Sequence, residues 1–376
     1  MSLTVLFLAN TLSYPQGGGH LWAYLNWALG LRALGCEVIW LEGILPETPA
    51  HEVQAYVAAL KSRLERFELA ERMMLCSRTA EPLPRGAAEG CLRLEEAGEV
   101  DLFLNLAYAI PPEVAGHFRR SALVDIDPGL TQIWMNAGLL SVARHDVYFT
   151  IGETVGRPEA PFPDCGLPWF YTPPPVFLPA WPATRADSTA PYTTVTHWWG
   201  SLMEYRGESY YNGKRDGFLP FLDLPHRTTV PLELVVCLAA NEDDERTMLG
   251  ARGWRLRDPR AVVSTPWDYR RYIQESRGEF SCAKPSCSRL QNAWISDRTL
   301  CYLASGKPAV VQHTGPSRFL PDAEGLFRFR DPEEAVRYLS IVEQDYERHS
   351  RAAVALAGEY FNSEKVLSRL LDQALR

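Results

Sequence analysis

The sequence lacks a basic excess and any long apolar run, and each absence excludes a class of function. Its 376 residues contain 38 Lys and Arg against 46 Asp and Glu, which gives a formal net charge of −8. Proteins that bind duplex nucleic acid usually present a basic face, so this balance argues against nucleic acid as the main partner. No stretch reaches the roughly 18 apolar residues that cross a bilayer, so no transmembrane segment is predicted.

A secretory leader, a disulfide framework and low-complexity tracts are also missing. The N-terminus has no basic residue before its first apolar run, which is unlike a signal peptide. The eight cysteines are scattered along a chain that is long enough to bury its own core. We therefore expect reduced thiols and a cytoplasmic location. With 46% hydrophobic and 22% charged residues, the composition is that of a globular protein and excludes a disordered or collagen-like chain.

Short apolar runs alternate with helical periodicity in the first part of the chain. Residues 17–20 form a glycine loop that follows a predicted strand and precedes a predicted helix at 21–31. A second strand follows that helix, so the first 42 residues indicate a strand–loop–helix–strand unit and hence a parallel sheet. A further helix is predicted over 53–67. The strands predicted here are 4–9, 37–41, 101–105, 122–125 and 146–150.

The second part of the chain repeats this alternation after a proline-rich stretch. Residues 158–182 contain nine prolines, a density that central strands and helices do not tolerate. Helices are predicted over 269–276, over 295–304 and from Asp331 to the end of the chain. The strands predicted here are 192–196, 231–238, 254–257, 278–281, 308–312 and 326–329.

The predicted fold class is therefore α/β, with two Rossmann-like domains that face a cleft. We expect an N-terminal Rossmann-like acceptor domain over 1–155 and a proline-rich linker over 156–190. A C-terminal Rossmann-like nucleotide-sugar domain is expected over 191–355, and a final helix over 356–376 is expected to pack back on the N-terminal domain. In open parallel sheets ligands bind beyond the carboxyl ends of the strands, so the polar residues there are the candidates for chemistry.

The C-terminal half resembles the nucleotide-sugar-binding domain of GT-B fold glycosyltransferases of the family 1/4-like kind. In those proteins a helix leads to a Gly-x-Pro strand, a glycine loop follows, and an Asp-Pro-Glu-Glu-Ala segment begins a later helix. The resemblance is clearest over 265–372, and the glycine loop at 17–20 resembles the first loop of the family more loosely. The segments that carry it are 281–284, 296–308, 314–315, 325–327 and 331–335.

The resemblance departs from the family at one feature. Many retaining members have two glutamates, separated by seven residues, before the Gly-x-Pro strand, and here Ala293 and Cys301 stand at those places. Their absence, together with a histidine in the first loop, favours an inverting mechanism. The resemblance implies a nucleoside-diphosphate sugar as co-substrate, with no metal and no other cofactor. The acceptor is left open between a glycan, a lipid-linked carrier, a peptide and a small metabolite.

Donor-binding residues are predicted where cations and loops can stabilise the departing diphosphate, which needs positive charge or fixed dipoles. Simpler explanations exist for several of them: Lys214 as a solvated loop charge, and Ser296 and Asp297 as helix caps. The glycine at 315 would let the backbone approach a phosphate. The predicted donor-binding residues are Lys214, Lys284, Ser296, Asp297, Arg298, Thr314 and Gly315.

His20 is the predicted general base, because it follows three glycines at the opening of the first helix. The resemblance to inverting members implies a carboxylate partner, for which Asp125 or Asp127 is available. Glu153 is a spare candidate, although a solvated loop carboxylate is the simpler interpretation. The predicted acceptor and loop residues are Gly17, Gly18, Gly19, His197 and Trp198, with the indole either stacking on a sugar or packing in the core.

Competing hypotheses rest on shorter signals. Asp125 and Asp127 form an Asp-x-Asp pair, which in GT-A glycosyltransferases holds a divalent cation against the diphosphate. A dinucleotide site would use Glu42 as the ribose acid, but Trp22 stands where a third small residue is needed.

A zinc site and a different reaction on the same fold are two more hypotheses. Cys282 and Cys287 suggest zinc only weakly, because no second pair has metal-ligand spacing. A sugar-nucleotide epimerase or hydrolase of the same fold, and a non-catalytic relative that only binds a sugar-nucleotide, also stay open.

Overall fold

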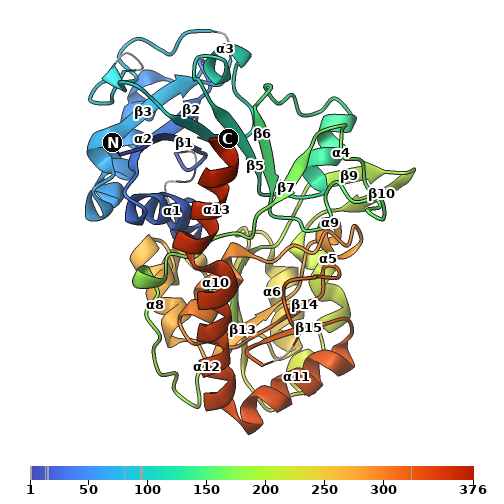
Figure 1. Cartoon of the computed structure of the whole chain (residues 1–376). Coiled ribbons are helices and arrows are strands. Elements are labelled where there is room, and N and C mark those ends of the chain that lie inside the picture. The colour runs from blue at the N-terminus through green and yellow to red at the C-terminus, as the bar shows by residue number, and fades with distance from the viewer. Residues whose placement is uncertain (1, 13, 15–16, 80, 94–95, 323) are drawn as a thin grey trace. The chain divides into compact units, whose positions relative to one another are not determined.

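The computed structural model describes residues 2–12, 14, 17–79, 81–93, 96–322 and 324–376. The chain divides into two compact units (Figure 1). Unit 1 contains Met1–Pro158, Phe162–Phe177 and Ser363–Arg376, and unit 2 contains Glu159–Pro161 and Leu178–Asn362. Each unit is built on a parallel sheet with helices, so the predicted fold class of two Rossmann-like α/β halves is confirmed. None of the helices in the described ranges combines the length and apolar character that a membrane span requires.

Unit 1 is a seven-stranded sheet in the described residues, with the order β3-β2-β1-β4-β5-β6-β7 and all neighbours parallel. Its strands are β1 (Thr4–Ala9), β2 (Glu37–Ile44), β3 (Met73–Ser77), β4 (Leu102–Asn105), β5 (Ser121–Asp125), β6 (Val147–Thr150) and β7 (Trp169–Tyr171). Its helices are α1 (Gly18–Ala33), α2 (Ala50–Leu64), α3 (Pro112–Ala115), α4 (Leu130–Asn136) and α13 (Ser363–Ala374), with the short turns η1 (Glu65–Phe67) and η2 (Ala70–Arg72).

Strand β1 is apolar throughout because both faces of the sheet are covered. Leu6 and Leu8 belong to a core cluster on one face, whereas Phe7 points to the other face and meets Tyr24 of α1 with ring centroids 6.4 Å apart. Two strands of the unit 1 sheet were not predicted, and both lie at its edges: β3, and β7 within the proline-rich stretch. An edge strand tolerates flanking prolines, so the exclusion of a central strand from this stretch agrees with the structure.

Helix α1 begins at Gly18, three residues before the predicted start at Leu21, so that His20 lies in its first turn. Residues 13, 15 and 16 of the preceding loop lie outside the described residues. At its other end, Gly30 lies directly against Ser363 and Leu367 of α13, which brings the last helix of the chain into unit 1 beside α1 (Figure 1).

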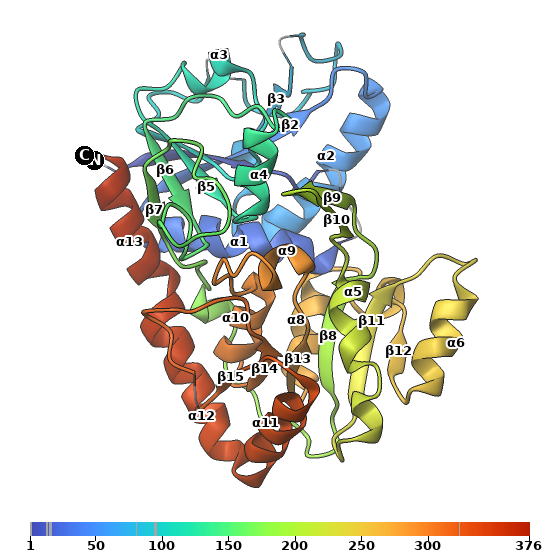
Figure 2. The ribbon, with the colours of Figure 1, turned by 90° about the vertical axis from the view of Figure 1, so that its right-hand side faces the viewer.

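Unit 2 is a six-stranded parallel sheet in the described residues, with the order β12-β11-β8-β13-β14-β15, and a separate hairpin of β9 and β10 (Figure 2). Its strands are β8 (Tyr192–His197), β9 (Leu202–Tyr205), β10 (Glu208–Tyr211), β11 (Leu232–Cys237), β12 (Arg255–Arg257), β13 (Gly278–Ser281), β14 (Ala309–Gln312) and β15 (Leu326–Phe329). Its helices are α5 (Lys214–Phe218), α6 (Asp243–Ala251), α7 (Pro259–Val262), α8 (Pro266–Glu275), α9 (Pro285–Ser288), α10 (Asp297–Ala304), α11 (Pro332–Gln344) and α12 (Tyr346–Leu356). Short helical turns complete it: η4 (Leu178–Ala180), η5 (Leu219–Phe221), η6 (Leu224–His226) and η7 (Ala357–Phe361).

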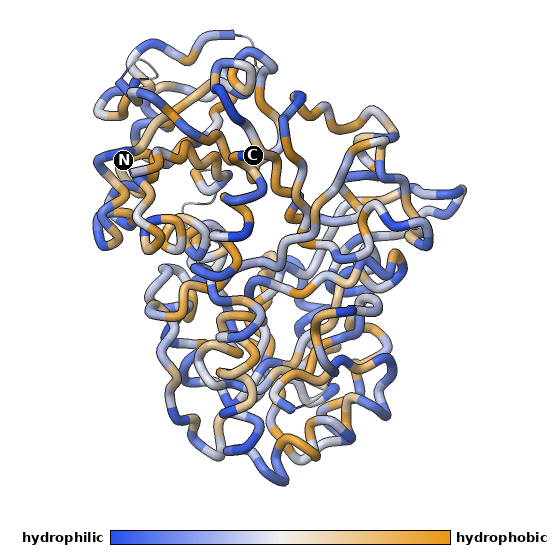
Figure 3. The backbone as a smooth tube through the Cα atoms, in the orientation of Figure 1, coloured by the Kyte–Doolittle hydropathy of each residue, from blue (hydrophilic) through white to orange (hydrophobic). Residues whose placement is uncertain are grey.

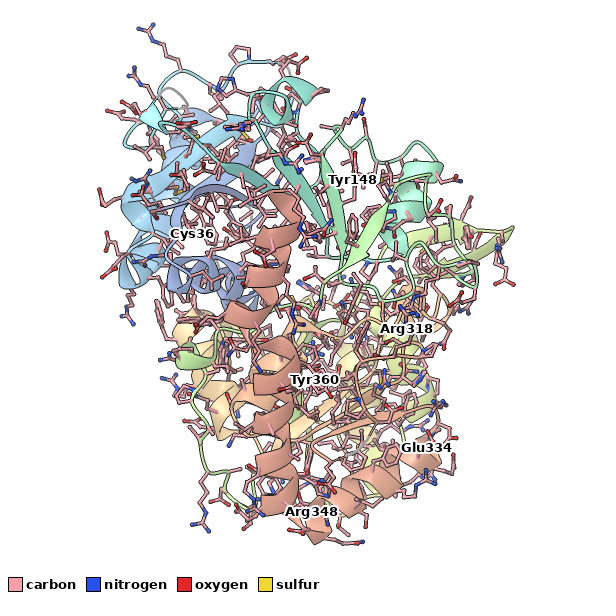
Figure 4. The ribbon with its side chains drawn as sticks, viewed as in Figure 1. Cys36, Tyr148, Arg318, Glu334, Arg348 and Tyr360 are labelled. Atoms are coloured by element: carbon pink, nitrogen blue, oxygen red, sulfur yellow. The ribbon has the colours of Figure 1, made fainter. Side chains whose placement is uncertain are left out.

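Aromatic side chains fill the core of unit 2. Phe280 of β13 stacks on Phe329 of β15 at 5.2 Å between ring centroids, and Phe218 and Trp254 pack edge to face beside them. The central strands of both sheets are accordingly among the hydrophobic segments of Figure 3. The predicted start of a helix at Asp331 is also confirmed, since its side chain accepts a hydrogen bond from the N–H of Glu334 on α11. Glu334 is labelled in Figure 4.

The two sheets share one strand order. In each parallel sheet, counting only its own strands in chain order, the first lies in the middle, the second and third lie on one side, and the fourth lies on the other. The order in which the chain adds strands to the sheet therefore reverses between β1 and β4 in unit 1 and between β8 and β13 in unit 2, although all the strands stay parallel. Such switch points open a crevice at the carboxyl ends of the strands, where ligands bind in doubly wound sheets.

Candidate functional site

The switch point of unit 2 is held open by the way its two middle strands pair. In the described residues, β8 and β13 pair only through Tyr192 with Gly278 and Thr193 with Glu279. Beyond these positions the pairing stops, so the carboxyl ends of the two strands diverge.

Arg298 of α10 fills the gap between these strands. Its Nε donates to Glu279 Oε1 at 2.8 Å, Nη1 donates to the carbonyl of Val195 at 2.9 Å, and Nη2 donates to Ser281 Oγ at 2.6 Å. Burial lowers the pKa of Arg298, but the Glu279 carboxylate outweighs it and raises that pKa above its ordinary value. The guanidinium is thus engaged with the strand ends and shapes the crevice, and donor binding by Arg298 stays a prediction.

Lys214 is the first residue of α5 and is buried beside the crevice. Its ammonium donates to the carbonyl of Cys282 and lies 5.8 Å from the ring centroid of Trp294. Burial lowers the pKa of Lys214 to about 7, and the charges of Arg298 and Lys284 act in the same direction. The interpretation of Lys214 as a solvated loop charge is therefore wrong, and a buried cation of this kind is a candidate anion ligand.

Hydrogen bonds and close packing connect three segments of the chain around Lys214. Gly217 of α5 lies so close to the carbonyl of Ala283 that a Cβ would collide with it. The N–H of Ala283 donates to Gln312 Oε1 at 2.8 Å, and the N–H of Ser286 donates to Asn212 Oδ1 at 3.0 Å. The segments after β10, β13 and β14 thus form one rigid edge within unit 2.

Lys284 follows at the end of that edge, as the residue before α9. It is half-buried and lies two residues after Cys282, whose carbonyl accepts from Lys214, and its charge contributes to the lowered pKa of Lys214. Across the part of the chain that the structure describes, no hydrogen bond or ion pair engages the Lys284 ammonium. A pair of adjacent cations with unused donors is suited to a multiply charged anion.

Ser296 and Asp297 begin helix α10. Ser296 Oγ accepts a hydrogen bond from the N–H of Arg298 at 3.3 Å and is the N-cap of the helix, and Asp297 is its first residue. This capping role is the simpler of the two explanations that the sequence allows, and it places both residues beside the crevice through Arg298.

The loop of Thr314 and Gly315 is packed against the chain itself. Thr314 Oγ1 donates to the carbonyl of Trp294 at 2.5 Å. Gly315 has a φ of 142°, and a Cβ there would lie 2.5 Å from the carbonyl oxygen of Gln291. The glycine therefore admits the 291–293 loop at the place where a phosphate was predicted. That loop holds Gln291 and Ala293 at φ of 51° and 57°, left-handed values that non-glycine residues rarely adopt and that often occur at functional sites.

The two tryptophans after β8 have different surroundings. Trp198 is fully buried and its Nε1 donates to Glu245 at 2.8 Å, so of the two alternatives that the sequence left open, the structure supports packing in the core. Trp199 is 51% exposed, and the guanidinium carbon of Arg215 lies 5.6 Å from its ring centroid. His197 is exposed at the end of β8. The indole that is exposed for stacking at this strand end is therefore that of Trp199.

In unit 1, His20 lies half-buried at the N-terminal turn of α1 between two tyrosine rings. The ring centroids of Tyr14 and Tyr24 lie 4.4 Å and 5.4 Å from that of His20. His20 Nε2 lies 2.6 Å from the carbonyl oxygen of Asn10, which can only accept, so Nε2 carries the proton. In the neutral ring Nδ1 is then the basic nitrogen. A backbone carbonyl takes the place of the predicted carboxylate partner.

The two carboxylates predicted as partners of His20, Asp125 and Asp127, lie at the end of β5 and just after it. Asp125 is fully buried and accepts from Gln132 Nε2 at 2.8 Å and Thr150 Oγ1 at 2.9 Å, and burial raises its pKa. The N–H of Asp127 donates to the hydroxyl of Tyr108 at 3.0 Å. Throughout the described ranges, no group of three or more His, Cys, Asp and Glu side chains is placed to hold a metal ion.

Two further carboxylates of unit 1 are buried. Glu153 is not a solvated loop residue, since it is almost fully buried and pairs with Arg157 at 2.9 Å. Glu42 was expected only as a ribose acid, yet its carboxylate accepts hydrogen bonds from the N–H groups of Thr11 and Leu12. It therefore serves the chain itself, a role that the spacing of the glycines could not indicate.

Known structures resemble the chain along its whole length. HepE from Anabaena in complex with UDP and glucose has a TM-score of 0.54 and 13% identity over 99% of each chain. A glycosyltransferase from Rickettsia africae has a TM-score of 0.56 and 11% sequence identity, over 99% of this chain and 98% of its own. An alpha-glucosyltransferase in complex with UDP-glucose and DNA has a TM-score of 0.58 and 11% sequence identity, over 100% of both chains.

By sequence, no family model and no curated protein matches the chain. The structural likeness at this low identity concerns the fold, and it establishes the GT-B fold for both units together.

Proposed function

We propose that the protein is a glycosyltransferase that moves a sugar from a nucleoside-diphosphate sugar to an acceptor hydroxyl. Unit 2 holds the donor, and the general base lies in unit 1. The observation that carries this proposal is the buried Lys214 beside the unengaged Lys284 at the switch point of unit 2. The GT-B fold supports it, because one neighbour of that fold is described as an alpha-glucosyltransferase in complex with UDP-glucose, and another is in complex with UDP and glucose. UDP-glucose is therefore the first donor to test.

The proposed chemistry assigns one task to each unit. As the acceptor oxygen bonds to the anomeric carbon, its proton passes to Nδ1 of His20. The bond from that carbon to the diphosphate breaks, and its electron pair leaves on the phosphate oxygen, where Lys214 and Lys284 stabilise the charge. Attack opposite to the leaving group inverts the anomeric centre. We propose that no metal is required.

Acceptor and location follow from weaker signals. The exposed ring of Trp199 suits a sugar face, so a glycan or a small glycosylated molecule is the acceptor class to test first. A net charge of −8 disfavours DNA, which one structural neighbour holds. All eight cysteines are free, which suits the reducing cytoplasm.

The test combines binding and turnover in the presence of a chelator. A thermal-shift comparison of nucleoside diphosphates should show a preferred ligand, because a ligand that binds only the folded state stabilises it by mass action. Incubation with the matching nucleotide-sugar and glycan acceptors should yield a glycosylated product. Stabilisation without turnover would favour a non-catalytic relative, and loss of donor without an acceptor would favour the epimerase or hydrolase. Absence of stabilisation by every nucleotide would contradict the proposal.

A further inference from the structure

A buried carboxylate in unit 1 collects hydrogen-bond donors at the end of β2. Glu42 is fully buried and lies at the switch-point edge of the sheet. Its oxygens accept from the N–H of Thr11 at 2.9 Å, the N–H of Leu12 at 3.2 Å and Nε1 of Trp40 at 2.9 Å. The hydroxyl of Thr11 donates to it as well.

Every group that faces Glu42 in these contacts is a donor. Burial raises the pKa of Glu42, and the hydrogen bonds from Thr11, Trp40 and Leu12 act against that rise by favouring the ionised form. When it is ionised, the carboxylate has only acceptor sites and can take all of these donors. A glutamine of the same shape would bring an N–H₂ group against donors and leave some of them unpaired. The position therefore requires a carboxylate for a reason other than shape.

The contacts of Glu42 lead to the ring of His20. Asn10 directly precedes Thr11, and its carbonyl accepts the hydrogen bond from His20 Nε2. The side chain of Asn10 accepts from Arg78 Nη2, while Arg78 Nε donates to the carbonyl of Gly43 at 3.1 Å. Strand β2 thus fixes residues 10–12 from two sides, through Glu42 and through Arg78.

We propose that Glu42 is a positioning residue for the general base. By fixing the start of the β1–α1 loop it sets the direction of the Asn10 carbonyl, which in turn holds His20 in the tautomer that leaves Nδ1 basic. This inference rests on the proposed function. It assigns to a buried acid on a neighbouring strand the orienting task that the resemblance gave to a carboxylate in contact with the ring.

The test compares Glu42→Gln with Glu37→Gln, an exposed carboxylate on the same strand that pairs with Arg72. Displacement of the base by about 1 Å costs on the order of 100-fold, so Glu42→Gln should lower kcat by about that factor. The KM for the nucleotide-sugar should stay within about twofold, since donor binding lies in unit 2, and Glu37→Gln should match the wild type. Thr11→Val, which removes one donor at constant shape, should give a smaller loss and serves if Glu42→Gln fails to fold.

A second readout does not depend on turnover. ¹⁵N NMR of the imidazole should show Nε2 protonated in the wild type and in Glu37→Gln, and a mixture of tautomers in Glu42→Gln. An unchanged tautomer, or a kcat in Glu42→Gln within twofold of the wild type, would overturn the inference. If the wild type transfers no sugar at all, the proposed function fails, and the tautomer comparison alone decides the positioning role.

Discussion

The two units share a strand order but bury opposite charges at their switch points. At the carboxyl ends of the unit 1 strands, Glu42 and Asp125 are fully buried acids: Glu42 accepts hydrogen bonds from the loop after β1, and Asp125 accepts one from Gln132 of α4. At the corresponding edge of unit 2, Lys214 and Arg298 are buried cations that donate to backbone carbonyls. We propose that this one architecture holds a base in one unit and an anion in the other.

This difference shows that the fold supplies the place and the buried charges supply the chemistry. An acid in unit 1 can order backbone N–H groups around a neutral histidine without adding positive charge. Cations in unit 2 order carbonyls and still present positive charge to a ligand.

Removal of the base should have the largest effect. His20→Ala should lower kcat by about 100- to 10,000-fold, the range for loss of a general base, while the affinity for UDP changes little. Initial-rate kinetics and calorimetric titration of UDP measure the two quantities. His51→Ala, an exposed histidine on α2, is the control and should behave as the wild type. Unchanged turnover in His20→Ala would remove His20 from the mechanism.

Removal of an anion-binding cation should act on the other unit. Lys284→Met should weaken UDP binding by about 10- to 100-fold, because a charge-assisted hydrogen bond is worth about 1.5–3 kcal/mol. Calorimetric titration measures the change, with Lys61→Met on α2 as the matched control. Equal UDP affinity in Lys284→Met and the wild type would show that the diphosphate lies elsewhere.

The lowered pKa of Lys214, about 7, predicts a pH dependence in both binding and stability. Its protonated fraction falls from about nine tenths at pH 6 to about one tenth at pH 8, so UDP affinity should fall several-fold over that range. Lys214→Met should flatten this slope.

The sign for stability follows from proton linkage. In the folded state Lys214 loses its proton near pH 7, whereas in the unfolded chain it keeps the proton up to its ordinary value of 10.5. The unfolded state therefore binds more protons between these values, and the contribution of Lys214 to folding stability rises with pH in that window. Denaturation of the wild type and Lys214→Met across pH 7–10 measures it. Parallel curves would contradict the burial of a titrating ammonium.

The smallest effect is expected at Trp199. Trp199→Ala should change the free energy of unfolding by less than about 0.5 kcal/mol, because the ring is half exposed. It should raise the KM for a glycan acceptor, and initial rates measure this. Trp198→Ala, by contrast, should destabilise unit 2 by about 3–5 kcal/mol, since it empties a fully buried site. Equal stability losses in the two variants would contradict their assignment.

The fold followed from local patterns, whereas the use of each charge did not. Continuous apolar runs such as that of β1 indicate buried parallel strands, so both sheets could be predicted. The early start of α1 at Gly18 and the edge strand β7 were missed, because glycine and proline obscure local preference. Whether Trp198 or Trp199 is buried depends on the neighbouring helix α5, which no local pattern specifies.

Site residues were harder to predict because their partners are distant in sequence. Lys214 and Arg298 have the same charge and both flank the crevice, but only the position of Glu279 decides that Arg298 is used inside the protein. Glu42 accepts from Trp40, two positions before it, but its other donors lie 30 and 31 positions away, which the local sequence does not indicate. The spacing of residues in the sequence could therefore predict the region of the site, but not the role of each side chain.

Hydrogen–deuterium exchange with and without UDP tests the central claim most directly. If the diphosphate binds at the switch point of unit 2, UDP should slow amide exchange in residues 282–294 and 313–315. Exchange that is unchanged throughout those two segments at a saturating UDP concentration would contradict the account.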